Sequence, residues 1–241
     1  MKRLVQLSCS AALTAWMPFG LATAAFAAGF DSGSNGSYGP INVTAPTTLD
    51  VPPDGIFHCT TITVTSTLRF NRNALNTPVY LLATGDVLIN GTINVSGGTG
   101  GGASARSGGP GGFDGGFGGF GDSAPANRGG DGHGPGRGRN QAGFTHAAYS
   151  KAAASNSEVY GNVLIVPLIG GSGGAGADGN PGGGGGGGGG AILIASNTRI
   201  TVNGNIISDG GGGTGWGSGG SIRLVAPTGS GGGGLYARSL S

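Results

Sequence analysis

The chain has 241 residues, of which 59 are glycine, and only 9% of the residues are charged. A formal net charge of +2, which includes Lys2 and Arg3 at the start, gives no electrostatic basis for binding nucleic acid or anionic membranes. Low charge favours self-association, and so much glycine requires either disorder or dense backbone hydrogen bonding.

The first residues have the pattern of a secretory signal. Lys2 and Arg3 precede a mostly apolar stretch from Leu4 to about Leu21, and Ala25-Phe26-Ala27 fits the small-residue cleavage pattern. This predicts a signal peptide at 1–27 with cleavage after Ala27, residues 22–24 being the second choice, and a mature chain at 28–241. Polar residues interrupt the stretch, which argues against a membrane anchor, and no later run is long enough to span a bilayer as a helix. We therefore expect a secreted or cell-surface protein, with the periplasm as the alternative.

Only two cysteines occur, and Cys9 lies inside the predicted signal. Removal of the signal would leave Cys59 alone, which excludes an internal disulfide in the mature chain. A packed thiol is the favoured interpretation of Cys59, and an intermolecular bridge is the alternative.

Residues 61–70 alternate between apolar and polar side chains. Ile62, Val64, Leu68 and Phe70 fall on one face and threonines on the other, which predicts a half-buried strand. Residues 79–95 hold two further strands by the same criterion, with a break at Gly85-Asp86.

The pattern of residues 81–98 returns at 193–211 with one added residue, so that Asn90-Gly91 matches Asn203-Gly204. A shorter repeat relates 191–198 to 221–228. Repeats of strand, turn and strand predict a solenoid. A hairpin at each Asn-Gly is the alternative, although the apolar phase continues through both glycines and favours a continuous or bent strand.

Two segments, 97–140 and 170–190, hold much of the glycine, and the second ends in the run Gly182–Gly190. Neither can bury a side-chain core of ordinary density, so they are either mobile loops or extended polyproline II-like chains that pack closely. Between them, residues 146–155 form the one stretch where a short helix is plausible.

The phrases NTPVYLLATGDVLINGTINVSGG, PLIGGSGG and GGGGGGAILIASNTRITVNG, followed by GGSIRLVAPT, resemble a group of secreted bacterial proteins over most of residues 50–228. The resemblance implies a glycine-rich parallel β-helix at the cell surface or beyond it, and no activity. A further coil is expected after Thr228, so the end at Ser241 indicates truncation or capping by another copy.

Together these patterns predict an all-β fold. We expect a right-handed parallel β-helix, or a related solenoid, forming a single domain over 28–241 with glycine-rich loop insertions at 97–140 and 170–190.

No sequence pattern strongly predicts a catalytic, cofactor-binding or metal-binding site. Asp178 in 173–181 matches part of a calcium-binding nonapeptide and is a weak metal candidate, because one copy is insufficient. Three dispersed histidines do not form a metal motif, and Cys59 and His58 point to opposite faces of a strand. These histidines are His58, His133 and His146.

The predicted function is an exported structural or adhesive protein without catalysis, whose partners are cell-surface glycans or copies of itself. A polysaccharide lyase or hydrolase is the enzyme alternative, for which Asp54, Asp86 and Asp209 are the carboxylates to test, although the repeat does not bring any two together. Ice binding through the threonines of 61–67, or a phage-type glycine-rich adhesin, is the second alternative.

Overall fold

The computed structural model describes residues 29–239 except residue 100 and residues 122–126, 141–144 and 150–157. The regular structure of this part of the chain is thirteen β-strands, without a helix. The strands are β1 (Gly39–Val43), β2 (Thr47–Asp50), β3 (Ile56–Val64), β4 (Thr67–Asn71), β5 (Val79–Ala83), β6 (Val87–Ile89), β7 (Thr92–Asn94), β8 (Ala191–Ser196), β9 (Arg199–Val202), β10 (Asn205–Ile207), β11 (Ser221–Val225), β12 (Thr228–Ser230) and β13 (Gly234–Tyr236).

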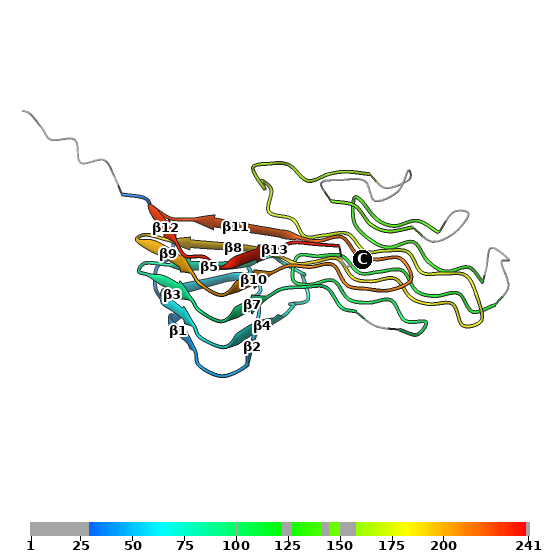
Figure 1. Cartoon of the computed structure of the whole chain (residues 1–241), viewed down its shortest axis with the longest axis horizontal. Helices are drawn as coiled ribbons and strands as arrows, with labels where there is room; N and C mark the ends of the chain where they lie inside the picture. The colour runs from blue at the N-terminus through cyan, green and yellow to red at the C-terminus, as the bar shows by residue number, and fades with distance from the viewer. Residues whose placement is uncertain (1–28, 100, 122–126, 141–144, 150–157, 240–241) are drawn as a thin grey trace, which may run out of the picture.

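The strands form two parallel sheets, which occupy the left part of Figure 1. The larger sheet has the order β11-β8-β5-β3-β6-β9-β12, and β1 also pairs with β3. The long strand β3 pairs with β5 through its first half and with β6 through its second half, which joins two rows of short strands into one sheet. The smaller sheet has the order β13-β10-β7-β4-β2.

The core lies between the sheets and consists of the apolar residues that alternate along the strands. Their side chains stack in columns, because residues in register on parallel neighbours face the same way. The predicted inward residues of β3 to β7 are all buried, and so are their counterparts in β8 to β10. Three of these columns contain Ile62, Val87 and Ile200, then Val64, Ile89 and Val202, then Leu68, Ile93 and Ile206.

The internal repeat predicted which strands are neighbours. Residues 79–94 pair with residues 192–207 at a constant separation of 113 positions, and residues 221–225 pair with 191–195 at a separation of 30. The added residue in the sequence alignment was wrong, because Leu81 pairs with Ile194 rather than with Leu193.

Each Asn-Gly pair is a corner between the two sheets and not a hairpin. Asn90-Gly91 connects β6 to β7, and Asn203-Gly204 connects β9 to β10 directly above it. A Cβ atom on Gly204 would lie 1.9 Å from the carbonyl oxygen of Gly91, so stacking of the corners requires glycine. The Asn203 side-chain amide donates to Asn90 Oδ1 at 2.9 Å and joins the two corners.

The glycine-rich segments form a packed array of extended chains beside the sheets, on the right of Figure 1. Gly182–Gly190 is its centre. Successive N–H groups of this run point to three different neighbours in turn, as expected for polyproline II geometry with three residues per turn. Its N–H groups donate to segments 95–102, 113–119 and 215–218, and its carbonyls accept from segments 106–109, 171–177 and 211–214.

The array contradicts the predicted fold class. A right-handed parallel β-helix with glycine-rich loop insertions is wrong, because 97–140 and 170–190 are not loops: in the described residues they are hydrogen-bonded to each other and to 208–220. The fold is two parallel sheets continued by a glycine array. The physical reason is that chains without side chains can approach until their backbones bond directly, so glycine builds a solid layer where ordinary residues would require a core.

The structure also tests the expectations for Cys59 and for a short helix at residues 146–155. Cys59 is fully buried, as the packed-thiol interpretation required, and burial raises the pKa of its thiol to about 12. Residues 145–149, at the start of the region where a helix was considered, are not helical, and 150–157 lie outside the described residues.

Candidate functional site on the glycine array

An exposed row of side chains lies on one chain of the array. Asp114, Phe117 and Phe120 are spaced by three residues along an extended segment, so they project from the same face of it. Phe117 is 50% exposed and Phe120 is 68% exposed, and their rings are stacked with centroids 6.4 Å apart. We call these three residues the Phe row.

The backbone beneath the Phe row is held by the adjacent antiparallel chain. Gly130 N–H donates to the Phe117 carbonyl at 2.8 Å, and Phe120 N–H donates to the carbonyl of Asn127 at 3.1 Å. A Cβ atom on Gly130 would lie 2.7 Å from the Phe117 ring, so the ring rests directly on this glycine. The two phenylalanines are therefore presented on a fixed platform.

A pocket of about 430 Å³ adjoins the first member of the row. It is lined by Arg72, Asn73, Ala74, Asn76, Gly112, Phe113, Asp114 and His133. The pocket thus combines an aromatic ring with amide, guanidinium, carboxylate and imidazole groups, which is the composition of a site for a small polar ligand.

A bidentate ion pair crosses the pocket. The Arg72 guanidinium donates to both oxygens of Asp114 at 2.5 and 3.0 Å, and the Gly108 N–H donates to Asp114 Oδ1 at 2.8 Å. Burial on its own would raise the pKa of Asp114, but these hydrogen bonds and the charges of Arg72 and His133 hold it below its ordinary value. Asp114 is therefore a fixed anionic acceptor at neutral pH.

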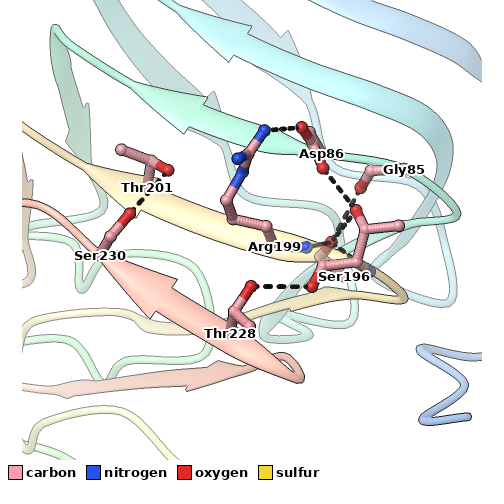
Figure 2. Close-up of polar contacts among 8 residues, drawn as sticks. Gly85, Asp86, Ser196, Arg199, Thr201, Thr228 and Ser230 are labelled. Atoms are coloured by element: carbon pink, nitrogen blue, oxygen red, sulfur yellow. Dashed lines mark hydrogen bonds and ion pairs between the residues drawn. The ribbon is translucent and has the colours of Figure 1, made fainter.

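A second polar surface lies on the outer face of the larger sheet, where β6, β9 and β12 meet (Figure 2). Asp86 accepts hydrogen bonds from Thr198 Oγ1 at 2.6 Å and from the Arg199 guanidinium. The hydroxyls of Thr201 and Ser230 are 3.0 Å apart. These contacts link successive strands, and they lower the pKa of Asp86, chiefly through the hydrogen bonds from Thr198 and Arg199.

This face does not carry a uniform row of hydroxyl groups. The register places Leu88, Thr201 and Ser230 in line with Thr63. An ice-binding surface needs the same small hydroxyl group strand after strand, so the mixed row does not favour that function.

The three aspartates considered for sugar cleavage have separate partners. Asp54 accepts a hydrogen bond from the Ile56 N–H at 3.0 Å, within its own turn. Asp209 is buried and bound by Arg238, whose guanidinium Nη2 lies 2.7 Å from Asp209 Oδ2. Asp86 is held by Arg199, as described above.

Asp178 also has hydrogen-bond partners within the protein. Its carboxylate accepts hydrogen bonds from the Gly129 N–H at 2.9 Å and from the Asn140 side-chain amide at 2.8 Å. Within the described residues, no three or more His, Cys, Asp or Glu side chains are grouped so that they could hold a metal ion. The predicted cleavage site at Ala27 lies outside the described residues.

The sequence marks Phe113, Phe117 and Phe120 as a possible binding cluster on a glycine platform, and the structure brings Phe117 and Phe120 together; sequence reasoning missed the ion pair. Arg72 and Asp114 are 42 positions apart and belong to different parts of the fold, so nothing in their spacing predicts the contact. The signal for the row was the alternation of paired glycines with larger residues in 113–120, which has a period of three.

A scan with protein-family models finds no match to the chain, and searches of curated proteins and of solved structures likewise find none. In the part of the chain that the structure describes, no helix has the length and apolar character needed to cross a membrane.

Proposed function

We propose that the chain is an exported, non-catalytic structural or adhesive protein of the cell surface or matrix, which binds glycans through the Phe row and the adjoining pocket. The observation that carries the proposal is the exposed, stacked pair Phe117 and Phe120 on a platform of hydrogen-bonded glycine chains. A single exposed apolar side chain needs no explanation, but exposed apolar groups that are in contact with one another mark a binding surface.

The chemistry of the surface fits a sugar chain. The apolar C–H face of a sugar ring packs on an aromatic ring, and its hydroxyl groups need donors and acceptors nearby. Phe117 and Phe120 supply the first kind of contact, while Asp114 and His133 supply the second at one end of the row. Because the glycine array is already ordered, binding would cost little additional backbone entropy.

The pocket favours binding over cleavage. Glycoside hydrolysis by the usual route needs two carboxyl groups on opposite sides of the bond. Among the residues that line this pocket Asp114 is the one carboxylate, and Arg72 holds both of its oxygens.

The test is retention of the exported protein on a panel of insoluble polysaccharides and cell-wall fractions, with affinity measured by calorimetry for any that bind. Phe117→Ala and Phe120→Ala should each weaken binding roughly tenfold, since an aromatic contact of about 1.4 kcal/mol corresponds to a factor of ten. Val163→Ala is the matched control, because Val163 is 97% exposed and lies outside the site.

Two results would overturn the proposal. One is binding that the phenylalanine variants leave unchanged. The other is release of sugar fragments that disappears in Asp54→Asn, Asp86→Asn or Asp209→Asn, which would assign the protein to the polysaccharide-active enzymes.

A further inference from the structure

Both sheets have an open edge at each end. In the described residues, β2 and β13 are the two outer strands of the smaller sheet, and β12 and β1 end the matching rows of the larger sheet. All pairing inside the sheets is parallel. The outer edge of β12 and β13 therefore presents the same pattern of backbone N–H and C=O groups that β9 and β10 present to β12 and β13, and a further parallel strand can bond to it.

The connections between the two sheets at the two ends have the same length. Three residues, 44–46, connect β1 to β2, and three residues, 231–233, connect β12 to β13. The inner turns have two residues at the same corner, at 65–66, 90–91 and 203–204. The first and last connections therefore share a length that the inner connections do not have.

The free backbone groups at the edges can be identified from the alternation of hydrogen bonds. Gly234 N–H donates to Gly204, and the Tyr236 carbonyl accepts from Ser208, so the groups of Leu235 between them point away from β10. At the other end, Val51 N–H donates to Asn71, and by the same alternation Thr48 points away from β4. Each edge thus has a defined set of unused donors and acceptors.

The last two strands, β12 and β13, do not fill all the space beside the buried core. Ile200 pairs with Gly229, where a Cβ atom would meet nothing within 4 Å, and Gly231 follows directly after β12, so neither position has a side chain to place beside Ile200 and Val202. The result is an apolar notch of about 390 Å³, at whose edge Leu235 is 52% exposed. At the opposite end Ile41 and Val43 are buried, so the first turn supplies the inward side chains that the last turn lacks.

We propose that a second copy of this chain covers the notch head to tail, with β1 and β2 of one copy continuing the sheets beyond β12 and β13 of the other. Extending the column of Leu68, Ile93, Ile206 and Leu235 places Thr47 of the next copy beside Leu235. In this register the Thr48 N–H of one copy donates to the Leu235 carbonyl of the other.

The register also defines where β1 and β12 can pair. Gly229 and Ser230 of β12 continue onto Ile41 and Asn42 of β1, whereas Thr228 reaches the position of Pro40, which has no N–H to donate. The low formal charge of +2 leaves little repulsion between copies. Head-to-tail contacts of this kind do not close on themselves, so they produce chains of molecules.

The test uses one proline at each edge and sedimentation velocity over a range of protein concentrations. Thr48→Pro removes one free donor of the first edge, and Leu235→Pro removes one free donor of the last edge; both leave the inner hydrogen bonds intact. The wild-type protein should form concentration-dependent oligomers. Each variant alone should associate at least tenfold more weakly, and an equimolar mixture should form a one-to-one dimer that grows no further.

Thr48→Ala is the matched control, because it keeps the N–H and should assemble like the wild type, and urea unfolding checks that each proline variant folds. A wild-type protein that stays monomeric up to its solubility limit would overturn the proposal. So would oligomers that neither proline weakens, or a Leu235→Pro effect without a Thr48→Pro effect, which would indicate tail-to-tail pairing or a different partner. These readouts are independent of glycan binding.

Discussion

Gly185→Ala tests whether the glycine array is a packed part of the fold. A Cβ atom on Gly185 would lie 2.0 Å from the carbonyl oxygen of Gly174, whereas ordinary contact begins at 3.4 Å. The neighbouring chain would have to move by about 1.4 Å, the difference between these distances. That movement is large enough to break the local hydrogen bonds, which include Gly185 N–H to Gly116 at 2.7 Å and Gly174 N–H to Gly186 at 2.9 Å.

The expected loss is about 3–6 kcal/mol in the free energy of unfolding. About 1 kcal/mol is lost for each of two or three hydrogen bonds, and forcing a methyl group into a packed interior costs a further 1–3 kcal/mol or so. Urea unfolding followed by circular dichroism and by the fluorescence of Trp216, which stacks on His146 beside the array, measures this quantity.

Gly101→Ala is the control for this prediction. Gly101 lies in the same glycine-rich region, but a Cβ atom there would meet nothing within 4 Å. This variant should remain within about 0.5 kcal/mol of the wild type. If Gly185→Ala did the same, the array would be loosely packed and the reasoning would fail.

Three further predictions concern titratable groups. Because burial raises the pKa of Cys59 to about 12, its share of the stability is complete below about pH 9 and is lost as the pH rises toward 12; alkylation mapped by mass spectrometry should leave Cys59 unlabelled at pH 8 until urea unfolds the chain. The pKa of Asp114 is lowered, so its ion pair stabilises the fold above the ordinary carboxyl pKa of about 4 and is lost as the pH falls through the lowered value; Arg72→Gln should remove about 1 kcal/mol at pH 7 and flatten the acid side of the stability curve. Arg238→Gln should leave the buried Asp209 without its counter-charge and speed hydrogen exchange in β13, and Asp209→Asn in the same chain should reverse part of that effect.

The sequence by itself determined the strands, their inward faces and their partners. Alternation along 61–70 and 79–95 predicted which side chains are buried, because a strand places successive residues on opposite faces. The repeat predicted the pairing of β5, β6 and β7 with β8, β9 and β10, because similar turns stack in register. Alternation and repeat both lie in the identity of the side chains, so both can be recognised in the sequence.

Only the tertiary structure decided what the glycine segments are. Gly182–Gly190 has no side chains to mark a face or a partner, so its sequence is equally compatible with a flexible loop and with the centre of a packed array. Which chains surround it depends on backbone hydrogen bonds between segments as distant as Gly98 and Gly187. The Phe row, the contact between Arg72 and Asp114 and the open sheet edges all depend on that arrangement, which alternation and repeats along the chain do not encode.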